Sequence, residues 1–150
     1  MFGLAVQALI NGTPVAELGA HIKKLGFNQE LRALIGAFDN FLTPNYGGAA
    51  NRVAVNPPKM VSLLFGMDCQ LTHVLPAAYF LLNRFPGDFE SAVLSASNGG
   101  GQNVVRAAMT GALSGAAVGV SGIPPRFIDD LSGGQQYLKQ AVAIADGTIA

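Results

Sequence analysis

Apolar positions along the chain recur mainly at helical spacing, three, four and seven residues apart. Leu18, Ile22 and Leu25 form one such stripe, and residues 31–38 carry another at positions 31, 34, 35 and 38. This spacing places apolar side chains on one face of an α-helix. No segment shows the strict alternation of a half-buried strand, although residues 52–55 are compatible with a brief extended piece. The pattern therefore predicts an all-α fold.

Capping and breaking residues set the expected helix bounds. Thr13 is a predicted N-cap with Pro14 at the first helical position. Asn28 and Asp88 are predicted N-caps of later helices, and Pro76 falls in the first turn of another. The predicted helices span residues 2–10, 14–25, 29–42, 59–65, 72–85, 89–97, 104–120, 126–131 and 135–145. We expect one domain over residues 1–150 without an internal repeat, with a long irregular loop at residues 43–58.

The predicted helix over residues 104–120 is built almost entirely from small side chains. One row repeats every fourth residue and consists of Ala107, Gly111, Gly115 and Gly119; a second row beside it consists of Ala108, Ala112 and Ala116. Glycine inside a helix costs about 1 kcal/mol relative to alanine. Close packing against neighbouring helices would offset that loss. We therefore predict a buried central helix with these rows in the core.

Composition and charge exclude several classes of protein. Half of the residues are apolar, 12% are charged, and the formal net charge is zero, so a packed core is expected and a nucleic-acid surface is not. The most apolar window, residues 104–120, is short for a bilayer span and contains Arg106. Cys69 is the single cysteine, which excludes an intrachain disulfide and predicts a buried structural thiol in a reducing, cytoplasmic setting. The N-terminus lacks the basic region of a signal peptide.

A glycine-rich loop precedes the small-residue helix and contains most of the candidate ligand-binding residues. The candidates are Asn98, Gly99, Gly100, Gly101, Gln102, Asn103 and Arg106. Free N–H groups at a helix N-terminus attract anions, but a tight interhelical turn explains the same glycines. Arg106 is the one charge in an apolar run. It either reaches a polar pocket at the loop or lies on the solvent side.

Other motifs carry weaker signals. Residues 131–136, Leu-Ser-Gly-Gly-Gln-Gln, match the signature peptide of ABC-type ATPases, but no phosphate-binding loop precedes them, so a glycine break before a helix is the better interpretation. A nucleotide-binding subunit using this peptide remains a third hypothesis. His21 and His73 lack cysteine or carboxylate partners at ligand spacing, so no zinc site is predicted. Asp129 and Asp130 are adjacent on a helix and point apart, which favours a capping or solvated role.

Several of these segments together resemble the C-terminal part of the ADP-ribosylglycohydrolases. The matching features are an acidic helix start at residues 88–90, the loop at residues 98–101, the small-residue helix, the Ile-Pro pair at residues 123–124, and the positions 127 and 131. The match holds without a gap over residues 100–131, and residues 76–79 extend it, so it is strongest over residues 72–131. The resemblance implies a compact multi-helix bundle. In active members it implies hydrolysis of ADP-ribosyl N- or O-glycosidic bonds with two magnesium ions.

This chain departs from the family at the metal motif. Active members read Gly-Gly-Asp-Thr-Asp-Thr where residues 100–105 read Gly-Gly-Gln-Asn-Val-Val. Magnesium prefers carboxylate oxygens. Gln102 offers one neutral oxygen, and Val104 and Val105 offer none. The glycine-glutamine-asparagine variant is similar to the lens crystallins of jellyfish and their relatives, where the resemblance implies packing instead of catalysis.

The family also draws metal ligands from an N-terminal half that a chain of this length is expected to lack. We therefore expect only the C-terminal half of the fold, no catalytic residues, no bound magnesium, and a structural or ligand-binding role towards an ADP-ribose-like molecule. The alternative is a hydrolase with an altered site built on Gln102, Asn103 and Arg106, or one completed by another chain. Because the expected helix at residues 2–10 has no preceding cap, we also expect an exposed apolar face covered by a homo-oligomer or a partner.

Overall fold

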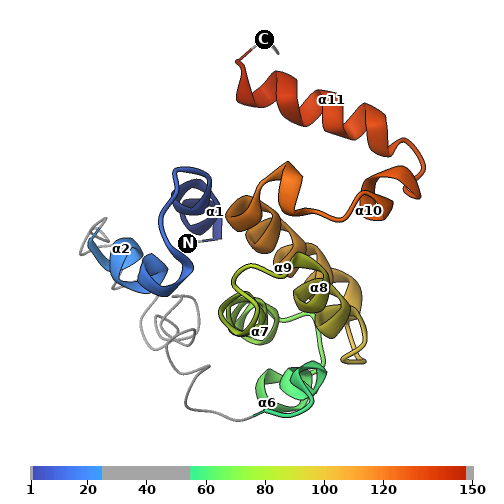
Figure 1. The fold of residues 1–150 in the computed structure, drawn as a ribbon. Helices are drawn as coiled ribbons and strands as arrows, with labels where there is room; N and C mark the ends of the chain where they lie inside the picture. The colour runs from blue at the N-terminus through green and yellow to red at the C-terminus, as the bar shows by residue number, and fades with distance from the viewer. Residues whose placement is uncertain (1, 25–54, 148–150) are drawn as a thin grey trace.

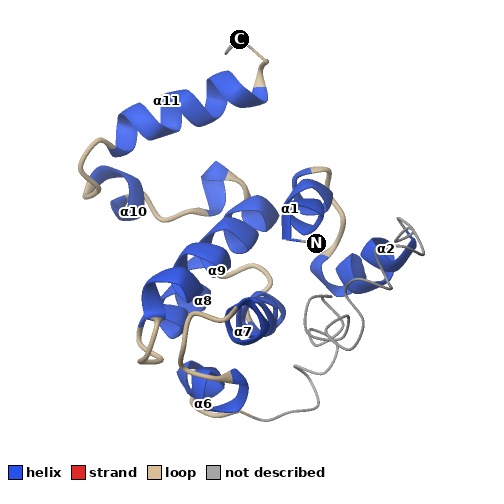
Figure 2. Cartoon of the chain, turned by 180° about the vertical axis from the view of Figure 1, so that it is seen from behind, coloured by secondary structure: helices blue, strands red, loops and turns tan. Residues whose placement is uncertain are grey.

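The computed structural model describes residues 2–24 and 55–147, and within these ranges it contains helices and no strands (Figures 1 and 2). The α-helices are α1 (Phe2–Ile10), α2 (Leu18–Lys24), α6 (Val61–Phe65), α7 (Leu71–Arg84), α8 (Phe89–Ser97), α9 (Asn103–Val118), α10 (Arg126–Asp129) and α11 (Gly134–Ala145). Three 3-10 turns add η1 (Val15–Glu17), η3 (Pro58–Met60) and η4 (Val120–Gly122). The predicted all-α class is confirmed. The helix expected after Asn28, the extended piece at residues 52–54 and most of the loop at residues 43–58 lie outside the described residues.

Helix α7 is the most deeply buried element. Nine consecutive residues, Val74 to Leu82, are buried, so this helix is covered on all sides. One apolar cluster joins it to α1, α2 and α9 through Leu9, Ile22 and Leu113. A second cluster joins it to α6 and α8 through Val61 and Ala96. Figure 1 shows α7 between α6 and the α8–α9 pair, which explains why it lacks a polar face.

Helix α9 buries a different face from the one predicted. Its buried residues are Arg106, Thr110, Leu113 and Ser114, at helical spacing. In the predicted core rows, Ala107, Gly111 and Gly115 are only half-buried, while Ala108 and Ala112 are exposed. The prediction weighed the small residues and missed that larger side chains, including an arginine, are the buried ones. A guanidinium is therefore buried near the N-terminus of α9.

The glycines of α9 lie against α8, although an alanine Cβ would fit at Gly111 and at Gly115 with ordinary van der Waals contacts. A Cβ added at Gly111 would be 3.7 Å from the Val93 side chain, and one at Gly115 would be 3.7 Å from the ring of Phe89. Gly119 takes no part, because the helix ends at Val118 and Gly119 is its C-cap with φ of 69°. Residues 119–120 were expected inside the helix. The left-handed glycine ends it, as is common at helix C-termini.

Two predicted helix starts differ in detail. Thr13 does not cap a helix: its N–H donates to the Ala8 carbonyl at 2.9 Å, which ties it to the end of α1, and the chain enters α2 through η1. Helix α7 begins at Leu71, so Pro76 is its sixth residue and lies beyond the first turn. A proline there lacks the N–H that would bond to the preceding turn.

The C-terminal helices extend away from the body of the molecule. Helix α11 packs on α10 and is otherwise largely exposed, as Figures 1 and 2 both show. At its start a Cβ on Gly134 would lie 1.9 Å from the Ile128 carbonyl oxygen, so this position requires glycine. In residues 2–24 and 55–147, no helix is both long and apolar enough to cross a membrane.

Candidate functional site

The loop between α8 and α9 has a backbone conformation that needs glycine. Gly100 and Gly101 have φ of 72° and 61°, in the left-handed region. A Cβ on Gly101 would lie 2.2 Å from the Met67 carbonyl oxygen. The Gln102 N–H donates to the same oxygen at 2.8 Å. The loop is therefore packed directly against the connection between α6 and α7.

The Arg106 side chain fixes this loop through two hydrogen bonds. Its Nε donates to the Ala96 carbonyl at 3.0 Å and its Nη2 donates to the Gly100 carbonyl at 2.5 Å. The side chain is only 1% exposed, and burial lowers the pKa of the guanidinium. Of the two alternatives for Arg106, the structure has the first: the side chain reaches the loop and not solvent. Its donors are directed at backbone carbonyls of this chain.

Two further side chains fix the loop at its ends. The Ser62 hydroxyl, from α6, donates to the Gly99 carbonyl at 2.5 Å. The Asn103 amide donates to the Ser97 carbonyl at 3.0 Å and so ties the start of α9 to the end of α8. Sequence reasoning missed Ser62, because a single serine in a short apolar helix gives no signal. Together with Arg106, these contacts make the loop a structural junction.

The first turn of α9 lacks ligands for a hard cation. It contains no acidic residue. Val104 is 74% exposed and Val105 is 36% exposed, so two apolar side chains lie at the surface where the family resemblance places acid and hydroxyl groups. The Gln102 side chain is exposed as well. In the described part of the chain, no three histidine, cysteine or acidic side chains come together as a metal site would need. The residues present do not fit magnesium.

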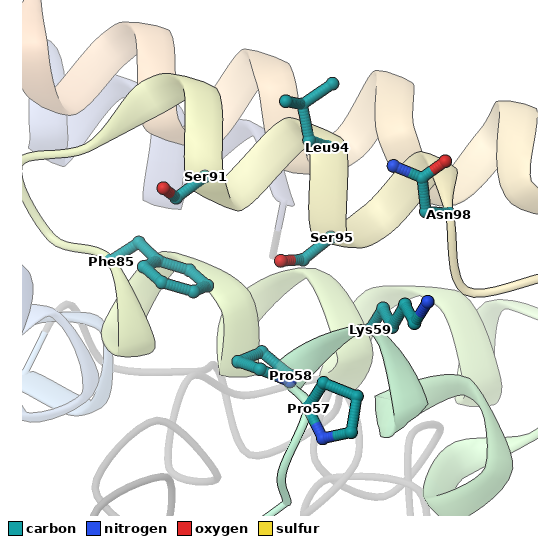
Figure 3. A pocket seen from close by; sticks show the side chains of 8 residues that line it. All are labelled: Pro57, Pro58, Lys59, Phe85, Ser91, Leu94, Ser95 and Asn98. Carbon is teal, nitrogen blue, oxygen red and sulfur yellow. The ribbon is translucent and has the colours of Figure 1, made fainter.

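An open groove with a volume of about 440 Å³ lies on the face of α8 turned away from α9 (Figure 3). Ser91, Leu94, Ser95 and Asn98 line one wall at helical spacing. The other wall comes from the segment that contains η3, with Pro57, Pro58 and Lys59, and Phe85 closes one end. Of the predicted loop candidates, only Asn98 lines this groove. No sequence pattern indicated this groove, because its two walls are far apart along the chain.

A histidine and an aspartate meet beside the glycine loop. The His73 Nδ1 lies 2.6 Å from Asp68 Oδ1, and both side chains are partly exposed. A hydrogen bond from the Gln70 N–H is the main reason that the pKa of Asp68 is lowered, and His73 adds to it. The expectation that His73 has no carboxylate partner is therefore wrong. A Cβ on Gly66 would lie 2.3 Å from the His73 ring, so this glycine makes room for the imidazole.

The remaining predicted positions are dispersed. Cys69 is exposed, which contradicts the predicted buried thiol. Its loop lies at the surface between α6 and α7. His21 is half-buried on α2, away from His73 in the chain. Asp129 accepts a hydrogen bond from the Gln135 amide at 2.8 Å and so links α10 to α11.

The peptide at residues 131–136 forms a tight connection. Gly133 is left-handed and Gly134 begins α11. The backbone therefore favours glycine at both positions, in agreement with the interpretation as a break before a helix.

Comparison with known proteins gives one match. The family model described as ADP-ribosylglycohydrolase matches residues 1–149. No curated protein and no solved structure matches the chain.

Proposed function

Because the chain belongs to the ADP-ribosylglycohydrolase family, we propose that it is a member without magnesium-dependent hydrolysis, whose role is structural or ligand-binding. The match supports an ADP-ribosylglycohydrolase-like protein over nearly the whole sequence. The loss of catalysis and the similarity to the crystallin-like members are our proposal. The observation that carries it is the first turn of α9, where Val104 and Val105 replace groups that bind metal in active members.

The charge around the loop supports the same proposal. The Gly100 carbonyl accepts a hydrogen bond from the buried Arg106 guanidinium. Among the described residues no carboxylate forms an ion pair with this guanidinium, so its positive charge is not neutralised locally. A fixed cation repels a second cation that approaches it. The absence of acidic ligands and the presence of the arginine both disfavour magnesium.

A calorimetric titration tests the proposal. ADP-ribose is titrated into the protein with and without magnesium, and release of ADP-ribose from an ADP-ribosylated peptide is followed in parallel. We expect no magnesium-dependent turnover and no difference in heat between the two conditions. Binding without magnesium would indicate the ligand-binding role, and no heat in either condition would leave the structural role. Magnesium-dependent turnover that disappears in Gln102→Ala would overturn the proposal.

The alternative function, a hydrolase with an altered site, is favoured by one observation. The Asp68–His73 pair lies in the connection whose Met67 carbonyl binds the glycine loop. A histidine oriented by a carboxylate through Nδ1 presents Nε2 as a proton acceptor, which is how a general base is arranged in many hydrolases. Such a site would act without metal. By contrast, the side chains of Asn103 and Arg106 donate hydrogen bonds to backbone carbonyls at the loop and at the end of α8.

Activity in the presence of a chelator separates the two functions. If the alternative holds, ADP-ribose release continues in EDTA. The rate should fall at least tenfold in His73→Gln, because that variant lacks the general base. His21→Gln is the matched control and should have no effect. Absence of turnover in EDTA rejects the alternative and leaves the proposed function unchanged.

The proposal also includes a partner and a location. Helix α11 exposes Tyr137, Val142 and Ile144, of which Tyr137 and Ile144 lie seven positions apart on one face. Exposed apolar residues of this kind support a homo-oligomer or a partner that completes the fold. Light scattering coupled to size exclusion tests this, and a clean monomer alone in solution would contradict the homo-oligomer. The single exposed thiol of Cys69 fits a reducing, cytoplasmic setting.

A further inference from the structure

The groove on the outer face of α8 has two chemically different ends. Figure 3 shows Phe85 at one end and Lys59 and Asn98 at the other, with Ser95 between them. The ring of Phe85 and the neighbouring Pro58 offer flat apolar surface. The opposite end offers the ammonium of Lys59 and the amide of Asn98, and the Ser95 hydroxyl lies between the two ends. A ligand that matches this groove is apolar at one end and polar at the other.

The charges around the groove set the sign and orientation of the ligand. Lys59 is the one ionisable residue that lines it in the described part of the chain, and no ion pair in that part involves its ammonium. Asp88 lies at the N-terminus of α8, next to the Phe85 end in sequence, where it accepts a hydrogen bond from the Ser91 N–H. An anionic group is therefore attracted to the Lys59 end and repelled from the other.

The helix dipole limits how much negative charge the groove accepts. Asn98 is the C-cap of α8, so the partial negative charge of the helix lies at the same end as Lys59. This partial charge, about half a unit, weakens the field of the single ammonium. The attraction of a ligand grows in proportion to its charge, whereas the cost of removing the ligand from water grows with the square of its charge. The site therefore favours a monoanion over a dianion such as a phosphate ester.

We propose that the groove between α8 and the Pro57–Lys59 segment binds small ring-containing monocarboxylates, with the ring on Phe85 and the carboxylate at Lys59, Ser95 and Asn98. This inference concerns a different surface and ligand class from the family reaction. It holds whether or not ADP-ribose binds or is hydrolysed.

The groove also contacts the structural loop. The Lys59 carbonyl accepts a hydrogen bond from Ser62 at 3.4 Å, and a Cβ on Gly99 would lie 2.7 Å from the same oxygen. The backbone on which the Lys59 side chain stands is therefore packed against the loop that Arg106 holds. Both walls of the groove belong to this fixed junction, so the ligand meets a largely preformed site.

Benzoate is the probe, and amide chemical shifts of isotope-labelled protein are the readout. For nine heavy atoms in an open groove we expect a Kd on the order of 1 mM. Shifts should concentrate at residues 91–98 and 57–59. Benzamide, of the same shape without charge, should bind about fivefold more weakly, as expected for loss of one partly exposed ion pair. Inorganic phosphate should shift none of these amides.

Two variants make the test specific. Lys59→Met should weaken benzoate binding about fivefold, and Ser95→Leu should abolish it by filling the groove. Lys139→Met, on α11, is the matched charge control and should bind benzoate as the unaltered protein does. Absence of shifts at roughly 20 mM benzoate, equal binding of benzamide, binding of phosphate at these residues, or insensitivity to both groove variants would each overturn the proposal.

Discussion

The Arg106 guanidinium donates to the carbonyl oxygen of Gly100 across 2.5 Å, and this bond joins the buried face of α9 to the glycine loop. The same side chain donates to the Ala96 carbonyl at the end of α8. One buried arginine thus connects two helices and the turn between them. Because both acceptors are backbone carbonyls of this chain, these two hydrogen bonds of the arginine stabilise the fold.

Removing this guanidinium should destabilise the protein strongly. Arg106→Met keeps an unbranched apolar stem but removes the guanidinium, which leaves the Ala96 and Gly100 carbonyls without their donors. Each buried carbonyl left unpaired costs about 1–3 kcal/mol, so we expect a loss of about 3 kcal/mol in the free energy of unfolding. Urea unfolding followed by circular dichroism measures it. Arg84→Met, at the exposed end of α7, is the control and should change stability by less than about 0.5 kcal/mol.

Two glycines with similar backbone angles should respond differently to alanine. Gly101 and Gly119 have φ of 61° and 69°, but a Cβ at Gly101 would be 2.2 Å from the Met67 carbonyl, while nothing lies within 4 Å at Gly119. Gly119 has ψ of 176°, so Gly119→Ala should cost only the backbone strain of a side chain in this glycine-favoured region, about 1–3 kcal/mol. Gly101→Ala should cost clearly more, because the backbone must shift. Equal unfolding free energies for the two variants would show that the loop does not lie against Met67.

The cap of α8 should make stability depend on pH in a known direction. Hydrogen bonds from Ser91, through its side chain and its backbone N–H, hold the pKa of Asp88 below its ordinary value. A lowered carboxyl pKa stabilises the fold above the unfolded-state pKa, and this contribution disappears as pH falls through the folded-state pKa. We expect Asp88→Ala to cost about 1 kcal/mol at pH 7. The difference from the unaltered protein should shrink in the acid range, and a difference that stays constant down to about pH 2.5 would contradict it.

A buried hydroxyl without a partner should be dispensable. The Tyr79 hydroxyl is buried and has no hydrogen-bond partner in the structure as described. Burial alone raises the pKa of Tyr79 far above its usual value. Tyr79→Phe removes the unpaired group and keeps the ring, so stability should be unchanged or rise by about 1 kcal/mol. A loss of more than about 1 kcal/mol would indicate a hydrogen bond to this hydroxyl, and Tyr137→Phe, on exposed α11, is the control.

The sequence by itself determined the helical class, most helix bounds and the need for glycine in the loop. Periodicity, the Asp88 cap and the glycine breaks are local, and they act through the backbone of a few neighbouring residues. The departure from the family metal motif at residues 102–105 was equally visible, because it depends on residue types alone. These predictions needed no knowledge of which helices meet.

Only the tertiary structure decided which face of α9 is buried and what the loop residues do. Small residues mark where helices approach, but burial depends on the neighbours, and the residues that α9 buries include Arg106 and Leu113 instead of Ala108 and Ala112. The Asp68–His73 pair is local, five positions apart, but the bond from Ser62 to Gly99 and the groove beside Lys59 join segments whose relative positions depend on chain packing. Pairwise contacts across elements depend on how helices pack in space, and no local pattern records that arrangement.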